Sequence, residues 1–588
     1  FFTNLIKKLH LYLFVLSMNK ANKLNDLFIY LLISFVVISP YVFFRLINNE
    51  KIVYTVSFYL IFLLITLNSN LKKPISKTLN SFIHVSNSIN NLIYYILIFI
   101  FVIITQNLYL NYETITWDTA SYLVASLPLQ DGYLPYETQW ESKGPLLTYI
   151  YYFLILLSNK SLVFIKLLND LILFIISILM FKTIGLIKKG EKLYSLTATL
   201  LFLSFVSEPQ YISAYSELFV VLFISTAYYL YWKFKWENNN TFFIPLIISL
   251  ASLINQVALI FLLPYIFDVI YKKKLTLEIF GKSLFGFFLP HILFQGIYIS
   301  NNLYDIFITN YLIIPFGYSS EGFVSISYSL NELKVWFRDY FYYNKYIYFS
   351  LVTLLFYQLL QILKDKKALF KDLTFMNIFF ALALYFIGGT NYSHHLFYFI
   401  FFIPFLIVNL NYNRSYIVVF LMIFLSASSI FYKTFPNASN NLANLNDIQN
   451  NYPVYKLSQE IDSYFENDYS IFALEYILVL FYLDKPNYSY IVHPTNHFEE
   501  YITSPLINFG RIRENNVDYL LSTKPDVILC NSIRIFAGGA PTENNDFDCS
   551  YDSYKSDYIQ LDTSEYRSDR TIEFYYDPYK PMNVFIEK

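Results

Sequence analysis

The sequence of 588 residues is short of charged residues, of cysteine and of the glycine-rich motifs that mark several enzyme classes. Asp, Glu, Lys and Arg make up 14% of the chain, the formal net charge is -1, and only two cysteines are present. Because no basic stripe exists to neutralise a phosphate backbone, we expect no nucleic-acid partner. The sequence also contains no Walker loop, no dinucleotide-binding glycine pattern, no His-Glu-x-x-His helix and no Cys-x-x-Cys pair. These absences argue against nucleotide-dependent, zinc-protease and thiol-redox enzymes.

Apolar side chains, in contrast, are abundant. Hydrophobic residues make up 56% of the chain, aromatic residues make up 21%, and the mean hydropathy is +0.42. This composition exceeds that of an ordinary soluble globule and predicts a polytopic α-helical membrane protein. The length of each apolar stretch is near the roughly 20 residues that a helix needs to cross a hydrocarbon core of about 30 Å. We predict about 13 spans, at 26–45, 52–68, 92–110, 161–185, 193–206, 217–232, 242–255, 257–271, 282–299, 346–363, 374–389, 396–410 and 415–432.

The basic residues predict how these spans are oriented. With the N-terminus inside, every basic cluster falls on the cytoplasmic side, as the positive-inside rule requires. An odd number of spans then places the C-terminus outside, so we expect an integral inner-membrane or plasma-membrane protein with a periplasmic C-terminal part. Residues 1–18 lack a small-residue cleavage site, so we predict no signal peptide there. The clusters are Lys7, Lys8, Lys20 and Lys23; Lys72, Lys73 and Lys77; Lys188, Lys189 and Lys192; Lys233 and Lys235; Lys272 to Lys274; Lys364, Lys366, Lys367 and Lys371; and Arg414.

Three regions follow from this pattern: an N-terminal segment 1–91 with two extra spans, a transmembrane domain 92–432, and a polar segment 433–588. The polar segment predicts an extracytoplasmic α/β domain, because short apolar runs alternate with helical patterns between turn signals. We expect strands at 469–473, 488–492 and 526–529, and helices at 454–465 and 512–521. Cys530 and Cys549 lie in this region, where a disulfide and two buried free thiols are equally compatible with the sequence.

The outer loop 111–160 concentrates polar chemistry directly after an apolar span. Between Trp117 and Leu147 it carries four acids and one lysine, which predicts an active-site loop at the membrane surface. Other segments on the predicted outer side add further acids and two histidines. The candidate residues of the loop are Asp118, Asp131, Glu137, Glu141 and Lys143, and those of the other outer segments are Glu208, Glu217, His394 and His395.

Several of these motifs have the order and spacing of a known family. The relevant motifs are Asp118 with Tyr122, Gly132-Tyr133-Leu134-Pro135-Tyr136, Lys143-Gly144-Pro145-Leu146-Leu147, Ser216-Glu217, and His394-His395-Leu396-Phe397. Over residues 92–432 the chain resembles the bacterial GT-C glycosyltransferases, the relatives of protein mannosyltransferases and aminoarabinose transferases. It departs from them where Thr119 replaces a second acid and Tyr215-Ser216 replaces an Asn-Thr pair.

The resemblance implies inverting transfer of a hexosyl or pentosyl group from a polyprenyl-phosphate donor to a lipid, glycan or protein acceptor on the outer face. Asp118 would take the proton of the acceptor hydroxyl, and Lys143 would stabilise the phosphate leaving group. No cofactor is required; outer carboxylates are compatible with a divalent metal, but no ligand spacing demands one. The further residues expected to bind substrate are His394 and His395 at the phosphate, Glu208, Glu217 and Glu141 near the sugar, and Tyr122, Tyr133, Tyr136 and Trp140 as stacking faces.

Each residue also has a structural interpretation. Asp118 is compatible with a helix N-cap, Lys143 with an interfacial anchor, Glu208 with an ordinary loop acid and the His pair with a hydrogen bond at a helix start. The alternative functions are a flippase or transporter of lipid-linked sugars, an O-antigen ligase or polymerase, and a partner-binding protein. A transporter should carry charges in mid-membrane. The interiors of the predicted spans hold few ionisable residues, for example Lys166, Asp170 and Asp268, which favours a surface enzyme.

Overall fold

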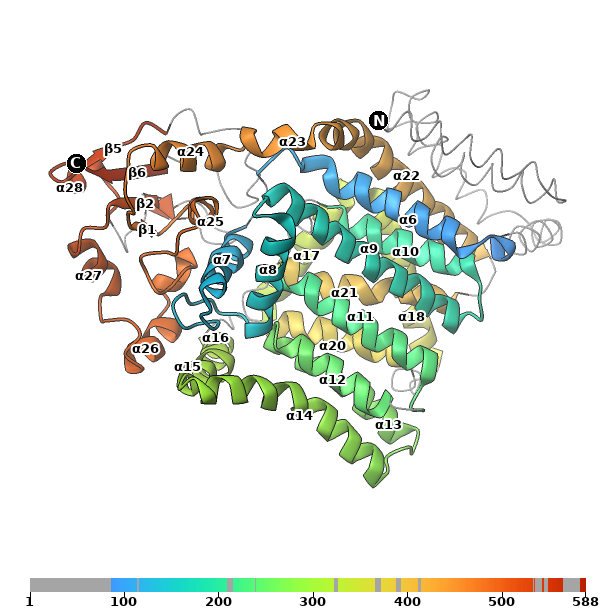
Figure 1. Ribbon diagram of the computed structural model, residues 1–588. Helices are drawn as coiled ribbons and strands as arrows, with labels where there is room; N and C mark the ends of the chain where they lie inside the picture. Colours follow the sequence, from blue (N-terminus) through green and yellow to red (C-terminus); the bar gives the residue numbers. More distant parts are fainter. Residues whose placement is uncertain are drawn as a thin grey trace.

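The computed structural model describes residues 86–113, 116–208, 215–237, 240–321, 326–364, 372–387, 393–410, 414–531, 533–534, 542–543, 548–563 and 582–588. These residues are mostly helical (74%). Figure 1 shows a bundle of long helices, with the C-terminal segment and its small sheet packed at one end. The predicted spans 26–45 and 52–68 lie outside the described residues.

Each predicted span from 92–110 onward coincides with a helix or a run of helices. Within the described residues, four helices are long and apolar enough to cross a membrane: Asn91–Tyr109, Leu162–Ile187, Leu277–Ser300 and Val419–Ala443. The other apolar helices are shorter, so the count of 13 and the orientation stay predictions. The helices are α6 (Asn91–Gln106) with η3 (Asn107–Tyr109), α9 (Leu162–Ile187), α10 (Lys192–Val206), α11 (Ser216–Phe234), α12 (Asn240–Ser252), η6 (Gln256–Phe261) with α13 (Leu262–Tyr271), α14 (Leu277–Ser300), α18 (Lys345–Lys364), α20 (Leu373–Ile387), η8 (Ser393–Leu396) with α21 (Phe397–Phe402) and η9 (Ile403–Asn409), and α22 (Arg414–Ala443).

Helix α14 illustrates why these helices suit a lipid environment. It lies along the edge of the bundle in Figure 1, and only 17% of its most apolar 18-residue stretch is buried inside the protein. Large apolar side chains such as Phe285, Ile292 and Leu293 are therefore exposed on its surface. Exposure of a contiguous apolar face of this kind to water is unfavourable, whereas its contact with lipid is favourable. The protein thus carries apolar helices fit for membrane association.

The outer loop 111–160 is largely helical. It contains α7 (Trp117–Ser126), η4 (Leu127–Asp131) and α8 (Pro145–Ser158). Thr116 caps α7, because its hydroxyl oxygen accepts the backbone N–H of Thr119 at 3.3 Å. Four further helices lie between α14 and α18: α15 (Tyr304–Ile308), the π-helix η7 (Thr309–Ile313), α16 (Ile314–Glu321) and α17 (Ile326–Tyr343).

The C-terminal segment combines short helices with a four-stranded sheet of order β1-β2-β6-β5, in which β1 runs parallel to β2 and the other neighbours are antiparallel. A disulfide joins Cys530 on β2 to Cys549. The strands are β1 (Ile471–Ala473), β2 (Val527–Asn531), β5 (Tyr558–Gln560) and β6 (Met582–Glu587), with a separate pair β3 (Ile533–Arg534) and β4 (Thr542–Glu543). The helices are α23 (Leu445–Ile448), η10 (Gln449–Asn451), α24 (Pro453–Asp462), α25 (Leu478–Leu483), η11 (Pro494–His497), α26 (Glu500–Asn508), α27 (Asn516–Ser522) and α28 (Tyr551–Tyr554).

Two details of this segment differ from the sequence expectation. Helix α22 continues through the expected boundary at residue 433 to Ala443, and one hydrophobic core runs from the bundle into β1 and β2. The predicted strand 488–492 forms only an isolated parallel bridge between Ile491 and Trp140 of the outer loop. This bridge attaches the C-terminal segment directly to the loop that carries the candidate site.

Candidate functional site

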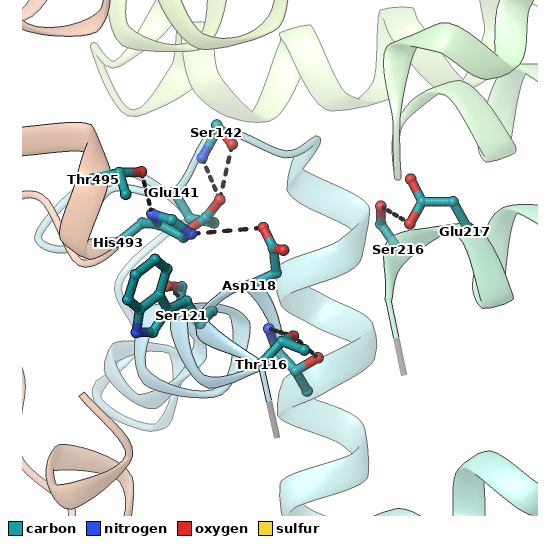
Figure 2. A network of polar contacts seen from close by, with 11 residues as sticks. Thr116, Asp118, Ser121, Glu141, Ser142, Ser216, Glu217, His493 and Thr495 are labelled. Carbon is teal, nitrogen blue, oxygen red and sulfur yellow. Dashed lines mark hydrogen bonds and ion pairs between the residues drawn. The ribbon is translucent and has the colours of Figure 1, made fainter. Parts of the chain in front are cut away.

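Asp118 lies in the first turn of α7, with its side chain about one-third exposed (33%). Thr116 occupies the N-cap position, so the capping role considered for Asp118 belongs to Thr116. Figure 2 shows the Asp118 carboxylate directed toward an imidazole, and its oxygen lies 3.7 Å from Nε2 of His493. An accessible carboxylate beside an imidazole is an arrangement suited to accepting a proton.

His493 comes from the C-terminal segment and was not among the residues predicted from the sequence. The Trp140–Ile491 bridge positions it: the N–H of Trp140 donates to the Tyr490 carbonyl at 2.6 Å, and the N–H of Val492 donates to the Trp140 carbonyl at 3.2 Å. Nδ1 of His493 lies 3.1 Å from the Thr495 hydroxyl, which fixes the ring orientation (Figure 2). Burial lowers the pKa of His493; the Asp118 charge opposes this shift and the Lys143 charge adds to it. The imidazole is therefore neutral at pH 7.

Glu141 is buried behind Asp118. Its Oε1 accepts the backbone N–H of Ser142 at 2.8 Å and the Ser142 hydroxyl at 2.9 Å (Figure 2). Burial and, to a smaller extent, the charge of Asp118 raise the pKa of Glu141 to about 7, although Ser142 and Lys143 act in the opposite direction. Within the part of the chain that the structure describes, Oε2 of Glu141 has no hydrogen-bond partner. Glu141 is thus a buried acid that is partly protonated near neutral pH.

The Lys143-Gly144-Pro145 motif has a clear packing reason. The Gly144 N–H donates to the Ile254 carbonyl at 2.9 Å, and the Leu146 N–H donates to the Leu253 carbonyl at 3.0 Å. A Cβ atom at Gly144 would lie 2.1 Å from the Leu253 carbonyl oxygen, so only glycine fits. Pro145 then occupies the first turn of α8, where its missing N–H costs nothing. The motif fixes the backbone of Lys143, whose carbonyl oxygen also accepts the Tyr136 hydroxyl.

Glu217 opens α11 and is almost fully buried. The Ser216 hydroxyl donates to its Oε2 at 3.2 Å (Figure 2), and Nδ2 of Asn255 lies 3.2 Å from Ser216 Oγ and 3.5 Å from Glu217 Oε1. His394 and His395, from η8, bring their ring nitrogens to this carboxylate, and the three donor atoms all lie within 4.8 Å of one another. Residues far apart in the sequence therefore form a cluster with metal-ligating chemistry that no sequence spacing revealed.

Lys143 connects the two halves of the site. Its charge interacts with Glu141 and His493 on one side, and with Glu217, His394 and His395 on the other. Asp118 interacts electrostatically with Glu141 and Glu217 as well. The loop, the start of α11, η8 and the C-terminal segment thus converge on one polar centre. This centre can accept a proton at Asp118 and bind an anionic group at the ammonium of Lys143.

Other predicted site residues take different positions. Tyr122 and Tyr136 are each 2% exposed and Trp140 is fully buried, so their rings pack inside the protein; only Tyr133, 44% exposed, presents an open ring. The three buried rings therefore present no open face on which a sugar could stack. Glu208 follows α10, where its N–H donates to the Phe205 carbonyl at 3.3 Å, and its part in the site stays a prediction.

Comparisons with known proteins add no name: no family model, no curated protein and no solved structure matches the chain.

Proposed function

We propose that this protein is a membrane glycosyltransferase that moves a sugar from a polyprenyl-phosphate-linked donor to an acceptor on the outer face of the membrane, with inversion at the anomeric carbon. The observation that carries the proposal is the convergence of Asp118, Lys143 and Glu217 on one polar centre beside apolar helices. The motif likeness to GT-C glycosyltransferases supports the same function independently of that geometry.

The chemistry follows from the residues. The acceptor hydroxyl attacks C1 of the sugar while the bond between C1 and the phosphate oxygen breaks, and the phosphate leaves with the electron pair. The Asp118 carboxylate takes the hydroxyl proton, because it is accessible and lies beside a neutral imidazole. The ammonium of Lys143 stabilises the charge that develops on the phosphate. Glu217 is fixed by Ser216, and its carboxylate would orient the sugar by accepting hydrogen bonds from the sugar hydroxyls.

His493 extends this mechanism to the C-terminal segment. Its imidazole lies 3.7 Å from Asp118 and is held by Thr495, so it is a positioning residue for the proposed base. Any movement of the Trp140–Ile491 bridge would move His493 relative to Asp118. We therefore assign the segment 433–588 a part in building the site, in addition to capping the outer face.

We propose that the site lies on the outer side of the membrane. The chain would cross the membrane about 13 times, with the N-terminus in the cytoplasm and the C-terminal segment in the periplasm. The disulfide between Cys530 and Cys549 supports an oxidising compartment for that segment. The test is a single cysteine at the exposed residue Asp131, since both native cysteines are paired. A membrane-impermeant maleimide should label Asp131→Cys in intact cells; labelling only after the cells are opened would contradict the orientation.

The experiment that tests the function uses the purified full chain in liposomes, with radiolabelled polyprenyl-phosphate sugars and a panel of lipid, glycan and protein acceptors. The expected result is label on an acceptor, with the anomeric configuration inverted. Movement of the labelled lipid across the bilayer without transfer would identify a flippase instead. Transfer of a whole preassembled glycan, but not of a single sugar, would identify an O-antigen ligase or polymerase.

A further inference from the structure

The cluster of Glu217, His394 and His395 offers the ligand set of a transition-metal centre. It supplies one carboxylate oxygen and two imidazole nitrogens, all within 4.8 Å of one another. Ligands of one zinc ion lie about 2.0–2.2 Å from it, so side-chain rotation must bring the donor atoms to separations of about 3–4 Å. Two imidazoles and a carboxylate favour zinc and similar divalent transition metals over calcium or magnesium, which prefer oxygen ligands.

Neighbouring residues orient two of these three side chains, Glu217 and His394. The carboxylate of Glu217 accepts from the Ser216 hydroxyl, and Asn255 contacts both residues. The ring of His394 stacks on Tyr215, with centroids 4.3 Å apart and an angle of 10° between the planes. Outer contacts of this kind orient metal ligands and limit the loss of side-chain freedom on binding. Glu217 is buried, whereas both histidines are half-buried, so the cluster is open on the histidine side.

We propose that Glu217, His394 and His395 bind a divalent transition-metal ion of the zinc class, which keeps an open coordination position for a phosphate oxygen. Three protein ligands with a free position are typical of catalytic rather than structural zinc sites. Lys143 precedes Gly144, whose N–H donates to the Ile254 carbonyl, and the next residue, Asn255, contacts Glu217. This backbone contact brings the lysine to the side of the cluster, where its ammonium would bind the same phosphate as the ion. The phosphate part of this inference rests on the proposed function, whereas the metal-binding part does not.

Metal binding is tested first, without any substrate. The full chain, carrying no polyhistidine tag, is stripped with a chelator, and its zinc content and affinity are measured by mass spectrometry and by competition with a chelating dye. We expect one ion per chain, and at least a tenfold loss of affinity in Glu217→Gln and in His394→Ala. His497→Leu is the matched control and should keep the ion, because this buried histidine of the C-terminal segment supplies none of the donor atoms.

Two further measurements keep the test decisive if one variant folds poorly. The melting temperature of each stripped variant shows whether it is folded, and His395→Asn provides an independent ligand change. Cobalt bound to the wild-type chain should give the absorption of a four-coordinate ion. Failure of the folded wild type to bind zinc, or binding that survives both Glu217→Gln and His394→Ala, would overturn the metal site and leave glycosyl transfer to be judged by its own assay.

The phosphate position is tested on the cobalt-loaded chain with farnesyl phosphate as the probe. The visible spectrum of the wild type should change as farnesyl phosphate is added, and Lys143→Gln should require at least tenfold more of the probe. A spectrum that does not respond to farnesyl phosphate would overturn phosphate coordination.

Discussion

The backbone at Gly144 packs against the Leu253 carbonyl without room for a side chain, so substitution of Gly144 by alanine tests how Lys143 is held in place. The new Cβ atom would lie 2.1 Å from the Leu253 carbonyl oxygen, whereas real contacts of this kind are longer than 3.0 Å. The two chain segments must therefore separate by about 1 Å, which stretches the hydrogen bonds from Gly144 to Ile254 and from Leu146 to Leu253. Overpacking typically costs about 1–3 kcal/mol, and each weakened hydrogen bond costs about 0.5–1.5 kcal/mol.

We expect Gly144→Ala to lower the free energy of unfolding by roughly 4 kcal/mol on these magnitudes. Backbone strain does not contribute, because Gly144 has φ -66° and ψ 154°, a conformation that alanine adopts readily. Gly281→Ala is the matched control, since nothing lies within 4 Å of its Cβ position in α14 and it should gain about 0.5–1 kcal/mol.

The assay for both glycine variants is the unfolding midpoint in a mild detergent, followed by tryptophan fluorescence, together with sugar transfer. Gly144→Ala should also lose transfer, because Lys143 moves with its neighbour. Wild-type stability in Gly144→Ala would refute the packing argument.

Two other predictions concern stability. The pKa of Glu141 in the folded protein, about 7, is above its ordinary value of 4.5, so its stabilising contribution is full below about pH 4.5 and is lost as the pH rises through 7. Between pH 4.5 and 7 the wild type should therefore lose roughly 3 kcal/mol more than Glu141→Gln, and equal pH slopes of the unfolding midpoints would contradict this. Cys549→Ser opens the disulfide to Cys530, 19 residues away, and should destabilise the C-terminal segment by about 3 kcal/mol. Proteolysis of folded wild type and variant measures the difference, with Asp552→Ser as a control at an exposed position.

The sequence predicted the helical elements well because apolar stretches report burial in lipid or protein directly. The predicted span 217–232 corresponds to α11 (Ser216–Phe234), and the span 161–185 corresponds to α9 (Leu162–Ile187). The apolar stretches do not show how many helices cross a bilayer, because several of the apolar helices are shorter than a membrane-spanning helix. It also could not separate transmembrane helices from α8 (Pro145–Ser158), an apolar helix inside the predicted outer loop.

The candidate site was only partly predictable, because it is assembled by contacts between distant segments. The outer loop motif identified Asp118 and Lys143, and the structure brings them together with Glu217, His394 and His395. His493 depends on the pairing of Ile491 with Trp140, which no local pattern encodes. The sequence contains one hint of His493: two of the seven histidines, His493 and His497, lie close together in the C-terminal segment.

The burial of Tyr122, Tyr136 and Trp140 was likewise invisible in the sequence. Aromatic residues near a membrane surface serve equally as interfacial anchors, stacking faces and core residues, and only the packing around them distinguishes these roles. The Tyr136 hydroxyl instead donates a hydrogen bond to the Lys143 carbonyl and so helps to hold the loop in place.

The central claim is that Asp118 takes a proton during sugar transfer, and its most direct test is single-turnover transfer by wild type, Asp118→Asn and Asp131→Asn. The last variant is a matched control, because Asp131 lies exposed in the same loop at the end of η4. We expect Asp118→Asn to slow transfer by about 10²–10⁴-fold, the usual contribution of a general base, and Asp131→Asn to keep the wild-type rate. Equal rates for Asp118→Asn and the wild type would contradict the claim.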